Sequence, residues 1–401
     1  MLGMLGYVLW PSRYNVLPHL AVGGSFVSIV VPSIILNVQD EYAQNVVDLY
    51  INIIVTGAFF YLLGALLGFI QGKGVKTHFS YDVMSVGDYE TRVIRVTQTL
   101  MALCVAGLVI SYLVMGFVPM FAENPIAAKL FRGPYQAPYS RVSIIFRSAF
   151  TIGSTIMPIA CVVWYKTRSR VTLMLIIATL GLMAVSLIRS GAFMGVVLAF
   201  AIVMSFKSRW HFALLMVILI GVFVFSSFFY YVVGINKMSD DTNIWKIITA
   251  GTPDIPDHLD FLTHYIDAPL PTYGRTIYGG LIPGHYQWNP AVYTLIMVNP
   301  GADINEIGSG GLRLPVPLWG YVSFGWVGVI AFTFFTGYLG GFFLKILKEM
   351  FYRYNSIIIL TIGLVAFSTV VRILVNFTEL SMYALPPAFV CLFYLYRFKL
   401  S

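Results

Sequence analysis

Long apolar stretches alternate with short polar ones along most of the chain. The apolar runs are about 17–25 residues long, which is the length that an α-helix needs to cross a bilayer. They predict ten transmembrane helices at residues 16–37, 48–70, 96–118, 144–165, 171–188, 190–206, 210–233, 318–343, 355–376 and 382–396. Only Ile188-Arg189-Ser190-Gly191 joins the fifth to the sixth, so we expect a very tight turn or a broken helix there.

A single long polar interval, residues 234–317, interrupts this pattern. It divides the chain into predicted helices 1–7 in residues 1–233, a large loop, and helices 8–10 in residues 318–401. Within the loop, Asp257 is expected to cap a short helix from His258 to Tyr265, and residues 243–250 are expected to form another. The predicted fold class is therefore an all-α polytopic membrane protein with about ten transmembrane helices and one large loop.

Composition supports a membrane protein. Of the 401 residues, 58% are hydrophobic and only 10% are charged, whereas a soluble domain carries nearer 25% charge. The three cysteines, Cys104, Cys161 and Cys391, fall inside apolar runs and are expected to be buried rather than paired or metal-bound. No cleavage site follows an apolar core near Met1, so we expect no cleaved signal peptide.

The distribution of charge predicts the orientation of the chain. The net charge of +8 would suit a nucleic-acid partner, but the basic residues concentrate in alternate loops. The short loops 166–170 and 207–209 carry basic charge only, which is typical of cytoplasmic loops. We therefore expect no nucleic-acid partner, two cytoplasmic termini, and a large loop that faces outward, into the periplasm of a Gram-negative cell.

Five arginines are predicted on the outward side, and a lipid pyrophosphate is the ligand that they suit. An arginine at membrane depth is costly and normally faces a cavity or a partner, and its guanidinium group binds phosphate oxygens in a fork. Alternatively, each arginine reaches lipid headgroups or pairs with an acid such as Glu379. The candidates are Arg147, Arg189, Arg275, Arg313 and Arg372.

Histidines and acids of the large loop are the candidate general bases. His264 and His285 can titrate near neutral pH, and His258 and Asp260 follow them. The alternative for each is a merely solvated side chain. The spacing supports no zinc site, and neither Asp-x-Asp nor a phosphate-binding glycine motif occurs, so we expect chemistry without a metal or a cofactor.

Aromatic residues are the candidate lining of a substrate cavity. The stretch Pro315-x-Pro317-x-x-Gly320-Tyr321-x-x-Phe324-Gly325-x-x-Gly328 opens the eighth predicted helix, and Gly320 and Tyr321 are expected at a cavity mouth. The alternative is a helix start whose small residues allow close packing. Tyr273 and Tyr278 in the loop suit the faces of sugars, although tyrosine also gathers at membrane interfaces.

Two short motifs resemble a known family. The Ser186-x-x-Arg189-x-Gly191 turn resembles the Ser-x-x-Arg-x-Gly signature of O-antigen polymerases and ligases. The late outward loop followed by Pro-x-x-Gly-Tyr-x-x-Phe-Gly is similar to Wzy-type polysaccharide repeat-unit polymerases. This resemblance implies a GT-C-like membrane glycosyltransferase of lipopolysaccharide biosynthesis, located in the bacterial inner membrane.

The resemblance also implies a reaction and partners. Glycans linked to undecaprenyl pyrophosphate would be joined at the periplasmic face, together with a chain-length regulator protein. Arg189, Arg147 and Arg275, and then Arg313 and Arg372, would stabilise the departing pyrophosphate. His264 or His285, and then Asp260, would take the acceptor proton.

Three other functions stay open. A membrane glycosyltransferase that uses polyprenyl-phosphate sugars would place its base at Asp40 or Glu41 in the first outward loop. An O-antigen ligase would differ only in its acceptor. A lipid-linked oligosaccharide flippase would not be an enzyme, and such transporters usually show repeated halves, of which this sequence gives no sign.

Overall fold

Helices make up the regular structure of the residues that can be described. The computed structural model describes residues 8–18, 20, 42–72, 86–188, 190–207, 210, 214–215, 217–218, 221, 254–282, 286–301, 311–312, 314–371, 373 and 382–396. Within them the long helices are α5 (Gln44–Gln71), α6 (Val86–Met115), α9 (Ser143–Thr167), α10 (Arg170–Ala184), α11 (Ser190–Lys207), α16 (Val316–Tyr354), α17 (Ile357–Ala366) and α19 (Leu385–Tyr396). Shorter helices are α7 (Pro125–Lys129), α8 (Gln136–Ser140), α14 (Asp254–Asp267) and α15 (Pro290–Val298).

Four segments are long and apolar enough to cross a membrane: Gln44–Gln71, Gly87–Phe121, Ser143–Thr167 and Val316–Tyr354. They overlap the helices predicted at 48–70, 96–118, 144–165 and 318–343. Shorter apolar helices occupy the predicted positions 171–188, 190–206, 355–376 and 382–396. Most of 16–37 and 210–233 lies outside the described residues, so the count of ten stays a prediction.

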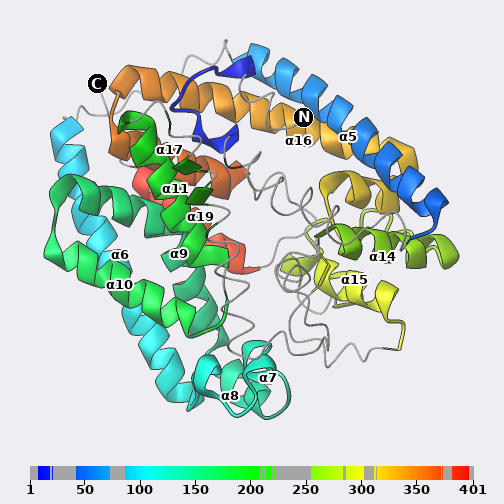
Figure 1. The fold of residues 1–401 in the computed structure, drawn as a ribbon, viewed down its shortest axis with the longest axis horizontal. Helices are drawn as coiled ribbons and strands as arrows, with labels where there is room; N and C mark the ends of the chain where they lie inside the picture. Colours follow the sequence, from blue (N-terminus) through cyan, green and yellow to red (C-terminus); the bar gives the residue numbers. More distant parts are fainter. Residues whose placement is uncertain are drawn as a thin grey trace.

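The helices α5 and α16 lie side by side and run in the same direction (Figure 1). A Cβ atom placed on Gly64 would lie 2.1 Å from the main-chain oxygen of Phe334, and one on Gly341 would lie 2.0 Å from that of Ala65. Residue numbers at these contacts rise together along both helices. The pair Gly64 and Gly68 on one helix therefore allows the close backbone approach that small residues four apart provide between membrane helices.

Contacts also establish the relative directions of α6, α9 and α11. Gly107 of α6 lies against Ala149 of α9, and Cys104 lies near Gly153, so these two helices are antiparallel. Gly195 of α11 lies against Met157, and Lys207 lies near Tyr165 at the other end, so α11 is parallel to α9. The molecule thus has two ends, which we name the loop end, where α14 and α15 lie, and the basic end opposite to it.

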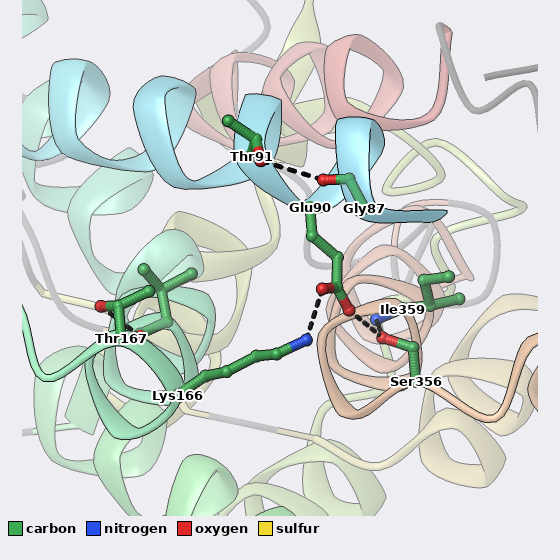
Figure 2. A network of polar contacts seen from close by, with 8 residues as sticks. Gly87, Glu90, Thr91, Lys166, Thr167, Ser356 and Ile359 are labelled. Atoms are coloured by element: carbon green, nitrogen blue, oxygen red, sulfur yellow. Dashed lines mark hydrogen bonds and ion pairs between the residues drawn. The ribbon is translucent and has the colours of Figure 1, made fainter. Parts of the chain in front are cut away.

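A polar network ties three helices together at the basic end (Figure 2). The Glu90 carboxylate of α6 pairs with the ammonium group of Lys166 at the end of α9. It also accepts a 2.7 Å hydrogen bond from the Ser356 hydroxyl, which in turn accepts from the Ile359 N–H and so caps α17. The Glu90 side chain is only 14% exposed, so this network fixes α9 and α17 on α6.

The helix α16 contains a sharp kink. Phe324 and Gly325 have non-helical backbone angles, with φ +61° and ψ −144° at Gly325. Residues 316–323 fold back on the start of the long portion, because a Cβ on Gly320 would lie 2.4 Å from the Gly328 oxygen. The prediction of one continuous helix at 318–343 is wrong in its first part, since glycine permits a backbone reversal there.

One local prediction is corrected, and another, a very tight turn or a broken helix near residue 188, is resolved as a turn. The helix α14 begins at Asp254, so Asp257 lies inside it and is not its N-cap. Proline is tolerated in a first helical turn, which lets the helix start ahead of Pro256. Between the fifth and sixth predicted helices the chain turns: α10 ends at Ala184, Leu187 has φ +61°, and α11 begins at Ser190. The segment at residues 243–250 lies outside the described residues.

Candidate functional site

A pocket of about 620 Å³ opens at the loop end of the α5 and α16 pair. We call it the tyrosine pocket, because tyrosine side chains from three separate segments line it. Its lining comes from the start of α5, the end of α14, the loop that follows α14, and the kink in α16. The lining residues are Asn45, Leu49, Tyr265, Ile266, Pro269, Pro271, Tyr273, Tyr321, Val322, Ser323, Phe324 and Gly325.

The amphipathic helix α14 forms one wall because its apolar face docks on α5 and α15. Leu259, Phe261 and Leu262 are buried in a cluster that includes Ile53 of α5. Polar contacts fix the register: the Tyr50 hydroxyl lies 3.0 Å from Nδ1 of the buried His258. His258, the third of the predicted bases, is therefore a packed residue of this interface rather than a solvent-facing one.

The loop after α14 is bonded directly to the kink. The Thr272 N–H donates a 2.9 Å hydrogen bond to the Val322 oxygen, and the Thr272 and Ser323 hydroxyls lie 2.8 Å apart. The Tyr293 hydroxyl of α15 donates to the Leu270 oxygen at 2.9 Å. These bonds hold the loop and the reversed part of α16 as one unit, so the pocket is preformed.

Three phenol groups converge in the pocket. The rings of Tyr265 and Tyr321 lie edge to face with 6.2 Å between centroids, and Tyr273 is 67% exposed at the rim. Burial raises the pKa of Tyr265 above its ordinary value, and the neighbouring Tyr321 and Tyr273 phenols raise it further. The Tyr265 hydroxyl therefore stays neutral at physiological pH and can both donate and accept hydrogen bonds.

The described lining carries no charged side chain. Flat rings and hydroxyl groups complement sugars, whose faces are apolar and whose edges carry hydroxyls. A diphosphate instead needs cations or clustered N–H donors. The pocket therefore suits an uncharged sugar, and a charged group of the same ligand would have to lie outside it.

Among the predicted cavity residues, Tyr321 and Tyr273 line the pocket, whereas Gly320 and Tyr278 do not. Gly320 is buried against Gly328 and serves close packing, as the alternative interpretation of this motif expected. Tyr278 precedes the turn Gly279–Leu281 with φ +51°, and burial raises the pKa of its phenol. The sequence did not predict Asn45 and Ser323 as pocket residues. The docking of α5 places Asn45 in the pocket, and the kink in α16 places Ser323 there.

The predicted base His264 lies on α14, directly before the lining residue Tyr265. Its Nδ1 is 2.8 Å from the main-chain oxygen of Asp260, an acceptor that requires the hydrogen to be on Nδ1. Nε2 then keeps the lone pair that a general base needs. The Asp260 carboxylate lies 3.8 Å from Nδ1, and both side chains are partly exposed.

Arg147 and Arg275 lie in two separate aromatic settings. Arg147, in the first turns of α9, donates from Nε to the Tyr139 hydroxyl, and its guanidinium group lies 4.9 Å from the Tyr383 ring centroid. Arg275 lies 4.8 Å from the ring centroid of Trp288. Neither has an acidic partner within ion-pair distance among the described residues. Both guanidinium groups thus remain able to bind an anion.

The gathering of five arginines around one hollow stays a prediction. Neither Arg147 nor Arg275 is among the lining residues of the tyrosine pocket. Arg189, Arg313 and Arg372 lie outside the described residues, as do the candidate base His285 and the acids Asp40 and Glu41 of the alternative enzyme.

Comparison with protein-family models, with curated proteins and with solved structures finds no match to this chain. Within the described ranges, no three His, Cys, Asp or Glu side chains are grouped so that they could hold a metal ion.

Proposed function

We propose that this protein is a membrane glycosyltransferase that joins lipid-linked oligosaccharide repeat units into a surface polysaccharide, as O-antigen polymerases do. The observation that carries the proposal is the tyrosine pocket at the loop end, preformed and lined by rings and hydroxyl groups. A pocket of this kind, at one end of membrane-length helices, suits a substrate that has a sugar head and a lipid tail.

The acceptor sugar would occupy the tyrosine pocket. Its ring would stack on Tyr321, and its hydroxyls would bond to the Tyr265 and Tyr321 phenols and to Asn45. His264, the neighbour of Tyr265, would take the proton of the attacking hydroxyl at Nε2, and Asp260 would stabilise the resulting cation. Because His264 is not a lining residue, the attacking hydroxyl would have to project from the pocket past Tyr265 to reach it.

The donor would be a glycan on undecaprenyl pyrophosphate. The acceptor oxygen would form a bond to the anomeric carbon while the bond from that carbon to the pyrophosphate oxygen breaks, and the pyrophosphate would leave with its lipid. Negative charge on the leaving group grows in the transition state, so cations would accelerate the step. Arg147 and Arg275 would supply them, together with Arg189, Arg313 and Arg372.

This function requires the loop end to face the periplasm, with ten helices in a bacterial inner membrane, both termini in the cytoplasm, and a chain-length regulator as a partner. The alternation of helix direction supports such a topology. The four helices α5, α9, α11 and α16 are all predicted to run inward. As this requires, α5 is parallel to α16 and α9 is parallel to α11. The helix α6, predicted to run outward, is antiparallel to α9.

Purified full-length protein in vesicles, supplied with undecaprenyl-pyrophosphate-linked repeat units, provides the test. We expect longer glycans on a gel. Tyr321→Ala should lower their rate of formation about 5- to 150-fold, because the lost ring stacking is worth about 1–3 kcal/mol. Tyr352→Ala, which truncates an exposed tyrosine at the basic end, is the matched control.

Two outcomes would contradict the proposal. Movement of the lipid-linked units across the membrane without new glycosidic bonds would identify a flippase instead. Transfer onto a lipid A core, without polymerisation of the units, would identify a ligase.

A further inference from the structure

Three basic residues gather at the basic end, where α9, α10 and α11 meet. The Arg168 guanidinium group and the Lys207 ammonium group each lie 5.1 Å from the ring centroid of Tyr165, and Arg168 also lies 5.4 Å from that of Trp164. Arg170 is the first residue of α10. We name Arg168, Arg170 and Lys207, with these two rings, the α9–α11 basic cluster.

The cluster holds positive charges close together. Because Arg168 and Lys207 are each 5.1 Å from one centroid, at most about 10 Å separates them. This upper bound is comparable with the Debye screening length, which is about 8 Å in physiological salt and about 10 Å at 0.1 M, so salt screens the repulsion between the two charges only in part. The rings hold the cations by a weak attraction, about 0.5–1 kcal/mol at exposed sites, and do not neutralise them.

No protein acid neutralises this cluster in the described part of the chain. The nearby Lys166 is paired, since it binds the Glu90 carboxylate that also accepts from Ser356 (Figure 2). Arg168, Arg170 and Lys207 have no carboxylate within ion-pair distance among the described residues. The described residues therefore leave the positive charge of the cluster without a neutralising carboxylate.

The helix ends offset only part of this charge. Arg168 caps α9 and Lys207 ends α11, and each helix C-terminus carries about half a negative charge. The N-terminus of α10 adds about half a positive charge. Arg170 lies at that N-terminus, so its interaction with the dipole of its own helix is unfavourable. A clear excess of positive charge remains.

Apolar surface begins directly beside the cluster. Along α10, Val171, Met174 and Ile177 are 58%, 68% and 61% exposed and recur every three residues, which places them along one strip. A free phosphate ion would use the cations alone, whereas a phospholipid would use both the cations and this strip. Basic pockets between membrane helices on the cytoplasmic side are known to bind lipid headgroups.

We propose that the α9–α11 basic cluster binds the phosphate headgroup of an anionic phospholipid. One acyl chain lies along the exposed strip of α10. Trp164 and Tyr165 lie at the headgroup level, where such rings are enriched. This site is at the opposite end from the tyrosine pocket, and the inference does not depend on the proposed glycosyl transfer.

Native mass spectrometry of the full-length protein, titrated with phosphatidylglycerol, tests the site. Arg168→Asn removes the charge and suits the left-handed backbone at this position, where φ is +55°. We expect Arg168→Asn and Lys207→Gln each to weaken the tightest phosphatidylglycerol binding about fivefold, as loss of one surface cation should. Arg168→Lys should keep most of the binding.

The controls separate this site from general attraction and from misfolding. Arg353→Gln removes a cation of the same end that lies over a single ring, that of Tyr354, and should leave the tightest binding unchanged. An equal loss in Arg353→Gln would overturn the proposal, as would equal affinity for phosphatidylcholine. Displacement of the lipid by millimolar inorganic phosphate would show a free-anion site and would also overturn it.

Discussion

At the scale of single residues, the chemistry proposed for this protein depends on one tautomer of one histidine. The Asp260 carbonyl accepts from Nδ1 of His264 within the same helix, so a standard helical spacing of four residues sets the proton on the correct nitrogen. The neighbouring Tyr265 lines the pocket, whereas His264 itself is not a lining residue and adjoins the pocket only through Tyr265.

Replacement of His264 by alanine should therefore lower the rate of glycan extension by about 10²- to 10⁴-fold, the contribution typical of a positioned general base. Initial rates with lipid-linked repeat units measure the effect. Asp267→Asn, at an exposed position at the end of the same helix, is the control and should keep the rate. An unchanged rate in His264→Ala, with protein levels equal, would exclude this role.

At the scale of elements, the parallel pair α5 and α16 forms the frame on which the pocket is built. The backbones approach so closely at Gly64 that a methyl group would lie 2.1 Å from the Phe334 oxygen, and main chain cannot move aside as a flexible side chain can. Gly64→Ala should cost about 1–3 kcal/mol of stability, as overpacking usually does. The midpoint of thermal unfolding in detergent measures this.

Gly181 of α10 provides the matched control for that substitution. It is also a glycine in a membrane helix, but no atom lies within 4 Å of an added Cβ. Gly181→Ala should leave the midpoint unchanged or raise it slightly, because alanine favours helix. Equal destabilisation by both substitutions would contradict the close α5–α16 contact.

The kink in α16 is a second element with a specific consequence. A Cβ added at Gly325 would meet no atom within 4 Å, so a substitution there acts only through the left-handed φ of +61°. Gly325→Ala should cost about 1–3 kcal/mol and also weaken sugar binding, since the kink lines the pocket. Thermal unfolding and titration with a repeat-unit sugar measure the two effects. Gly116→Ala, at φ +71° and also free of neighbours, should cost stability but keep sugar binding.

The sequence predicted the helices better than it predicted how they pack. Apolar length located the helices at 48–70 and 144–165 within a few residues, because spanning a bilayer imposes a length. The sequence did not predict the backbone reversal at Gly325, because the residues on either side of it are as apolar as those of a straight membrane helix. Tyr321 was found through its glycine-rich motif, whereas Asn45 joins the pocket only through a contact far along the chain.

At the scale of the whole molecule, the two ends carry different chemistry. The loop end holds the tyrosine pocket and Arg275, and the basic end holds the Glu90 network and the α9–α11 basic cluster. Arg147 lies in the first turns of α9, at the end of that helix away from Lys166. A bilayer would separate these ends, because helices such as α5, with 28 residues at about 1.5 Å each, are longer than the hydrocarbon core of about 30 Å.

Cysteine labelling can establish which end faces outward. Cys104 and Cys391 are buried, and Cys161 is only partly exposed within α9, so their background reaction should be low. A membrane-impermeant maleimide added to intact cells with a permeable outer membrane should label Tyr273→Cys, because that side chain is 67% exposed at the loop end. It should label Arg353→Cys, at the basic end, only after the inner membrane is opened. The reverse pattern would place the tyrosine pocket on the cytoplasmic side of the membrane. That result would contradict a polymerase that acts at the periplasmic face.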